Sequence, residues 1–296
     1  MKNEELYILP FDHRNSFTQK IMQIKDREPT SKELQQERKL KIIIYQAFKK
    51  AVSEGIPKNS AGILTDEFLG NEVLKKARKE KYIFCLPVEK SGQEEFHYEH
   101  GKNYKQHIKK WNPTYVKVLV RYNPEGDKKL NKRQAKKLAE LSRYLKKIGK
   151  KFMLEVLVLP TRSEKKIKNY DQTLRPKLMV KAIKELHASG AYPDIWKIEG
   201  LDKTKDMQKV ADQINNGDTE ARIIILGRGE SAKKAEQWLK AGAKVKTAIG
   251  FAIGRTIFEK PLEEYISGKI SKEQTIEKIK NNYKHFYNFW KKVKNY

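Results

Sequence analysis

The stretch Tyr115-Val-Lys-Val-Leu-Val120 has the length and apolar content of a buried β-strand, yet Lys117 lies inside it. The same pattern recurs in two later stretches, Phe152-Met-Leu-Glu-Val-Leu-Val158 and Asp194-Ile-Trp-Lys-Ile-Glu199. These place Glu155 and Lys197 at the centre of apolar runs. Because a lone buried charge costs several kcal/mol, we expect the three charges to share one solvated or mutually compensating pocket. Two lysines and a carboxylate also suit Schiff-base chemistry.

Apolar strand-like runs alternate with amphipathic helical stretches along the chain, which is typical of a parallel sheet. We expect strands at residues 6–11, 60–64, 82–86, 115–120, 152–159, 194–198, 222–226 and 247–251. The clearest helices are expected at residues 31–53, 131–148, 173–189, 204–214 and 231–240, with glycine stops at Gly149, Gly190 and Gly242. Eight strands of this kind predict a TIM (β/α)8 barrel.

The chain shows no Pro/Gly/Ser-rich linker and no low-complexity tract, so we expect one domain over residues 1–296. Residues 271–296 form an extension in which apolar side chains recur at spacings of three and four, the pattern of an amphipathic helix. We expect this helix to pack on the barrel exterior. The alternative is a subunit interface in a homo-oligomer.

Composition narrows the class of protein. No apolar run approaches 18 residues and the first residues lack a signal-peptide core, so we expect a cytoplasmic protein with no membrane span. The single cysteine, Cys85, fits a reducing compartment and is expected in the core. The net charge of +27 suggests a nucleic-acid partner, but only 12 of the 64 basic residues are Arg and the lysines are spread over every predicted helix. We therefore interpret the charge as solvated helix faces and do not expect nucleic acid to bind.

Residues at the carboxyl ends of barrel strands face the catalytic mouth. Asp12, His13 and Arg14 follow the first predicted strand, Glu89 follows the third, and Arg121 shares a face with Lys117 by its even spacing. Taken singly, Asp12 also fits a helix cap, Glu89 a solvated loop, and Arg121 or Glu199 an ion pair at the mouth. Their joint occurrence favours a substrate site.

The last two strands are followed by glycine-rich junctions. Gly227, Gly229 and Ser231 follow the seventh, and Gly254 and Arg255 follow the eighth. Free backbone N–H groups at such junctions bind phosphate, and loops seven and eight are the usual phosphate site of this barrel. Residues 227–232 also fit the dinucleotide pattern G-x-G-x-x-A, but no acidic residue follows at the spacing that would hold a ribose.

Metal and hydrolase sites have weaker support. His97 and His100 could bring two imidazoles together, but they lie in a polar stretch without a ligand-spacing motif, so surface histidines are expected. The sequence contains no G-x-S-x-G, no Walker motif and no cysteine framework for zinc. We therefore expect no metal and no cofactor.

Five stretches resemble a known family: Leu9-Pro-Phe-Asp-His-Arg-Asn-Ser-Phe17, Leu86-Pro-Val-Glu-Lys-Ser-Gly92, Val116-Lys-Val-Leu-Val120, Leu226-Gly-Arg-Gly229 and Gly250-Phe-Ala-Ile-Gly-Arg-Thr-Ile-Phe258. They are similar to the aldolase-like domain fused to 5-dehydro-2-deoxygluconokinase in myo-inositol catabolism, and the resemblance spans nearly the whole chain. More distantly, the order of Asp12, Lys117, Glu155 and Lys197 is similar to that of class I tagatose-bisphosphate aldolases.

The resemblance implies a metal-independent class I aldolase. Lys197 would be the imine lysine, its pKa lowered by burial and by the neighbouring cation Lys117. Glu155 would shuttle protons, and Asp12 would contact a substrate hydroxyl and accept its proton. The substrate would be a phosphorylated keto sugar or keto sugar acid, with 2-deoxy-5-keto-gluconate 6-phosphate and fructose or tagatose 1,6-bisphosphate as candidates. The alternative function is non-catalytic: the basic barrel would bind RNA or another polyanion.

Overall fold

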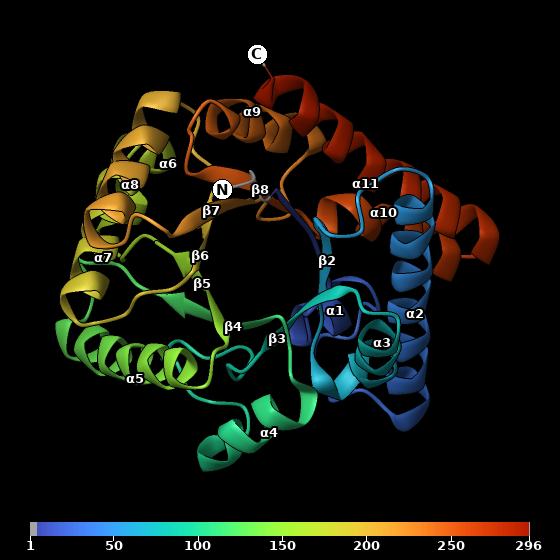
Figure 1. The fold of residues 1–296 in the computed structure, drawn as a ribbon. Coiled ribbons are helices and arrows are strands. Elements are labelled where there is room, and N and C mark those ends of the chain that lie inside the picture. Colours follow the sequence, from blue (N-terminus) through green and yellow to red (C-terminus); the bar gives the residue numbers. More distant parts are fainter. Residues whose placement is uncertain (1–4, 296) are drawn as a thin grey trace.

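The computed structural model describes residues 5–295, and within them eight parallel strands close into a barrel in sequential order (Figure 1). The strands are β1 (Leu6–Pro10), β2 (Ala61–Leu64), β3 (Ile83–Pro87), β4 (Tyr115–Arg121), β5 (Lys151–Leu157), β6 (Ile195–Glu199), β7 (Arg222–Leu226) and β8 (Ala248–Ala252). Strand β8 pairs with β1 to close the ring. The predicted TIM barrel is confirmed, and each predicted strand overlaps an observed one.

Helices surround the barrel in Figure 1. They are α1 (Asn15–Lys20), α2 (Ser31–Ser53), α3 (Glu67–Lys79), α4 (Tyr104–Trp111), α5 (Lys128–Lys147), α6 (Tyr170–Thr173), α7 (Arg175–Ala188), α8 (Thr204–Gly217), α9 (Ala232–Ala243), α10 (Arg255–Ile266) and α11 (Lys272–Lys294), with short 3-10 turns at Gly101–Asn103 and Glu164–Lys166. Among the described residues, none of these helices has the length and apolarity needed to span a membrane.

One predicted helix stop is wrong. Gly149 and Gly190 have left-handed backbones just past α5 and α7, as expected of helix stops. Gly242 instead lies inside α9, which continues to Ala243. A side chain at Gly242 would meet Ile225 on β7, so this glycine allows the helix to lie close to the sheet.

The pleat of the strands separates two packing regions. Outward side chains pack under the helices in the larger apolar core, whereas the smaller cluster fills the barrel interior. The interior cluster consists of Leu6, Ile8, Leu64, Cys85, Tyr115, Met153, Ile195, Ile224 and Ala252. Cys85 is fully buried there, which confirms its predicted core position. Toward the carboxyl ends of the strands, charged residues replace these apolar side chains.

The C-terminal helix α11 lies along the outside of the barrel, against α2, α9 and α10 (Figure 1). A capping box formed by Ser271 and Gln274 begins the helix. Its apolar face is buried, with Phe286 and Trp290 nearly inaccessible to solvent. The Tyr283 hydroxyl donates a 2.7 Å hydrogen bond to the Tyr7 carbonyl of β1. The predicted amphipathic helix therefore packs on the barrel exterior.

Candidate active site

A cavity opens at the carboxyl ends of β1, β3, β4, β5 and β6. Eight residues that the sequence singled out line it together: Asp12, His13, Arg14, Glu89, Lys117, Arg121, Glu155 and Lys197. The loop between β3 and α4 covers it with residues 90–96. Lys117 and Arg121 face the cavity from one side of β4, as their even spacing predicted. The expectation that the strand-borne charges share one pocket is confirmed.

Lys117 lies at the centre of this cavity and is held by three carboxylates. Its Nζ is 2.6 Å from Glu89 Oε1, 2.9 Å from Asp12 Oδ2 and 3.0 Å from Glu155 Oε2. The side chain is only 2% exposed. Burial opposes the charge, but the three carboxylates outweigh it and raise the pKa of Lys117 well above its ordinary value. Lys117 is therefore a fixed ammonium group.

Lys197 shares one of these carboxylates. The register pairs Glu155 on β5 with Lys197 on β6, and Lys197 Nζ lies 2.8 Å from Glu155 Oε2. That single oxygen therefore lies within salt-bridge distance of both lysines. Burial works against ionisation of Glu155, but Lys117 and Lys197 overcome it and lower its pKa. The amine of Lys197 and the carboxylate of Glu155 are thus in direct contact.

The remaining titratable groups differ in charge. Burial opposes ionisation of Asp12, yet Lys117 and Lys197 hold its pKa below the usual range. Burial raises the pKa of Glu89, whose Oε2 is buried without a hydrogen-bond partner. Burial lowers the pKa of His13 to about 4, which favours a neutral imidazole. Among the three carboxyl groups, Asp12 and Glu155 thus favour the ionised form, whereas burial favours the protonated form of Glu89.

Two arginines at the rim bind the covering loop. Arg14 donates to the Glu89 carbonyl at 2.8 Å and contacts Glu99 at 2.5 Å. Arg121 donates to the Gln93 carbonyl at 2.5 Å. Both arginines also line the cavity and so place positive charge at its mouth.

The five predicted phosphate-binding residues do not line this cavity. Ser231 accepts from Lys234 N and caps α9, and Arg255 donates to the Arg228 carbonyl at 2.6 Å. Its guanidinium lies beside Gly229, where an added side chain would collide with it. Gly227 is buried, while Gly254 begins α10 without a side-chain cap. Phosphate binding at these residues stays a prediction.

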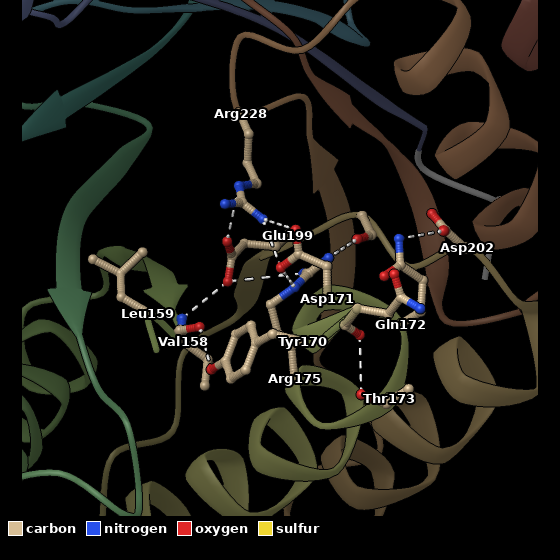
Figure 2. A network of polar contacts seen from close by, with 12 residues as sticks. Val158, Leu159, Tyr170, Asp171, Gln172, Thr173, Arg175, Glu199, Asp202 and Arg228 are labelled. Carbon is tan, nitrogen blue, oxygen red and sulfur yellow. Dashed lines mark hydrogen bonds and ion pairs between the residues drawn. The ribbon is translucent and has the colours of Figure 1, made fainter. Parts of the chain in front are cut away.

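An ion-pair network that includes Glu199 lies beyond β6 and β7 (Figure 2). Arg228 Nε is 3.3 Å from Glu199 Oε1, and Arg228 Nη1 is 3.2 Å from Asp171. Glu199 Oε2 accepts from Val158 N at 2.9 Å, and Asp171 also accepts from Arg175 Nε at 2.8 Å. The expected ion pair of Glu199 exists. Its partners come from α7 and the β7 loop, which are distant in sequence.

The histidines at 97 and 100 do not form a pair with each other. His97 is exposed, whereas His100 is partly buried and contacts Glu67 and His107. Both side chains reach solvent, as expected of surface histidines, but His100, with 35% of its side chain exposed, also belongs to this cluster. Sequence spacing could not show this contact, because Glu67 lies 33 residues away.

Comparisons with known proteins agree with the fold. Residues 1–294 match the model of a family described as an uncharacterized protein conserved in bacteria, DUF2090. No curated protein matches the sequence.

Three solved structures cover nearly the whole chain. A Schiff-base-forming fructose-1,6-bisphosphate aldolase has 13% identity and a TM-score of 0.58, with 97% of this chain and 96% of that chain covered. Cgl0159 from Corynebacterium glutamicum has 14% identity and a TM-score of 0.61, covering 95% and 88%. A fructose-bisphosphate aldolase from Slackia heliotrinireducens has 12% identity and a TM-score of 0.57, covering 94% and 86%. At these identities the likeness establishes the barrel fold.

Proposed function

We propose that this chain, which belongs to the DUF2090 family, is a class I aldolase that cleaves or forms a phosphorylated keto sugar through an imine on Lys197. One observation carries the proposal: Lys117 and Lys197, both buried at the mouth of the barrel, contact the same oxygen of Glu155. A second amine beside a fixed ammonium supplies a nucleophile.

The geometry distinguishes the two lysines. Three carboxylates surround Lys117, so removing its proton would leave their charges uncompensated. Lys197 has Glu155 alone as a carboxylate within salt-bridge distance among the described residues. It is therefore the lysine that can lose a proton and attack a carbonyl carbon. The constant charge of Lys117 disfavours a second charge beside it.

Glu155 is placed to move the protons of imine formation. It would accept the proton of Lys197, and the neutral Nζ would then bond to the ketone carbon. The same carboxyl would give its proton to the new alkoxide and take one from the positively charged nitrogen, which forms a neutral carbinolamine. Protonation of the carbinolamine hydroxyl by Glu155 then releases water and leaves the iminium. The first of these transfers joins groups that already lie 2.8 Å apart before substrate binds.

Asp12 would accept the proton of the substrate hydroxyl during cleavage. As that proton leaves, the carbon–carbon bond breaks and its electrons move into the iminium, which becomes an enamine while the aldehyde departs. The low pKa of Asp12 makes it a weak base while it is bound to Lys117. If the substrate hydroxyl displaced Lys117 from Asp12, the Asp12 carboxylate would become a stronger base. Glu89, on the other side of Lys117, would then hold the ammonium in place.

A phosphorylated keto sugar fits the charges around the mouth. Arg14 and Arg121 line the cavity, and the uncapped start of α10 at Gly254 offers backbone N–H groups for a phosphate. We propose that Gly227, Gly229, Ser231 and Arg255 complete this phosphate site. The candidate substrates are 2-deoxy-5-keto-gluconate 6-phosphate and fructose or tagatose 1,6-bisphosphate.

The test is cleavage of these three sugar phosphates, measured as release of the three-carbon product. At least one should be cleaved by the wild-type protein. Substitution of Lys197→Met should reduce kcat by about three orders of magnitude or more, because no other group can form the imine. Undiminished cleavage by the Lys197→Met variant would refute the assignment.

A further inference from the structure

Outside the catalytic cavity, Glu67, His100 and His107 bring three ligand-type atoms together. One nitrogen of each imidazole and one carboxylate oxygen all lie within 4.8 Å of one another. The three residues come from separate places: the start of α3, the end of the β3–α4 loop and the middle of α4. None of them lines the cavity that contains Lys117 and Lys197.

Both imidazoles are directed at the same carboxylate oxygen. His100 Nε2 lies 2.8 Å from Glu67 Oε2, and His107 Nδ1 lies 2.7 Å from that oxygen. The two rings are stacked, with centroids 3.5 Å apart and planes 8° from parallel. The side chains are between 15% and 35% exposed, so an ion could reach them from solvent. Little rearrangement would be needed for all three to bind one ion.

A further residue fixes the orientation of the carboxylate. Trp111 Nε1, one turn after His107 on α4, donates to Glu67 Oε1. This leaves Oε2 directed at the imidazoles. Outer contacts of this kind orient metal ligands in proteins and raise their affinity for the metal.

We propose that Glu67, His100 and His107 bind a divalent transition metal, with Zn²⁺ the best fit. Two imidazoles and one carboxylate form a donor set that zinc takes in a tetrahedral site, with water as the fourth ligand. Lys110 Nζ lies 3.8 Å from Glu67 Oε1, but its side chain is 62% exposed and free to turn into solvent. Bound zinc would take over the hydrogen bonds that the imidazoles now make to Glu67.

Such an ion would hold the loop that covers the catalytic cavity. Residues 90–96 of the β3–α4 loop line the cavity, and His100 lies where this loop joins the following 3-10 turn. The preceding residue, Glu99, contacts Arg14 at the cavity rim. A metal joining His100 to α3 and α4 would thus restrict the loop from its far end. The ion positions the loop and takes no part in the imine chemistry.

Zinc titration of the untagged, full-length protein tests the site. The wild-type protein, stripped with a chelator, should bind one equivalent of Zn²⁺, and Co²⁺ in its place should give the visible absorption of a tetrahedral site. Substitutions Glu67→Gln, His100→Ala and His107→Ala should each weaken zinc binding at least about tenfold. The matched control His97→Ala removes an exposed histidine of the same loop and should bind zinc like the wild type.

Two further measurements are needed. One distinguishes loss of the zinc site from general unfolding, and the other tests zinc binding independently of the proposed aldolase function. Zinc should slow trypsin cleavage at Lys90 in the wild type, and Glu67→Gln, which preserves side-chain size, should lose that protection. Lys197→Met should bind zinc normally, so the result does not depend on the aldolase assignment. Absence of stoichiometric binding, or equal loss in His97→Ala, would overturn the proposal.

Discussion

Lys117 is the residue on which the charge balance of the cavity depends. It compensates three carboxylates, and removal of one partner from a buried ionic cluster costs about 3–5 kcal/mol. We expect Lys117→Met to lower the free energy of unfolding by about this amount in urea titrations at pH 7. We also expect kcat to fall by about a hundredfold or more, because the fixed charge beside the imine is lost.

A matched control exists in another buried lysine. Lys41 forms an ion pair with Asp66, both side chains are almost fully buried, and Lys41 does not line the cavity. Lys41→Met should lose comparable stability but retain most of its kcat at a temperature where it is folded. Equal kcat losses in the two variants would show that Lys117 acts only through stability.

His13 should make the folding stability of the protein depend on pH, and the direction of its pKa shift gives the sign of that dependence. Its pKa is about 4 in the folded protein and about 6.5 in an unfolded chain, so between these values the unfolded state binds more protons. Folding stability should therefore rise with pH from 4 to 6.5, by up to about 3 kcal/mol from this residue. Urea unfolding of the wild type and His13→Asn at pH 4.5 and 7 checks this. A stability difference that does not change with pH would contradict the role of His13.

At the scale of elements, the barrel closes where β8 meets β1. Gly250 pairs with Leu6, and a side chain at Gly250 would lie 1.8 Å from the Leu6 carbonyl oxygen. The Leu6 carbonyl is part of the backbone and cannot move aside as a flexible side chain could. We expect Gly250→Ala to destabilise the protein by about 1–3 kcal/mol or more, measured by urea unfolding. An unchanged midpoint would mean that the strands separate here at little cost.

The strands and their charged residues could be predicted because both follow from local pattern. Apolar runs mark strands, and even spacing along β4 places Lys117 and Arg121 on one face. Contacts made by loops could not be predicted in this way. Asp171 reaches Arg228 from α6, a helix of only four residues, and Glu67 contacts His100 although 33 residues separate them in the sequence.

At the scale of the whole molecule, the net charge of +27 leaves two functions in competition. As an aldolase, the protein would use its positive field to attract anionic substrates. As a polyanion-binding barrel, it would bind RNA with an affinity that falls steeply with salt and does not depend on Lys197. The buried site favours the aldolase function. A barrel that binds RNA through its surface lysines has no need of two buried lysines on one carboxylate oxygen.

Borohydride reduction in the presence of a phosphorylated ketose, followed by peptide mass spectrometry, tests the imine directly. Reduction should fix the substrate carbon skeleton on Lys197 and abolish activity. Lys117 should remain unmodified, because three carboxylates keep its amine protonated. Modification confined to other lysines, or RNA binding that persists in Lys197→Ala with no cleavage of any keto-sugar phosphate, would contradict the assignment of this barrel as a class I aldolase.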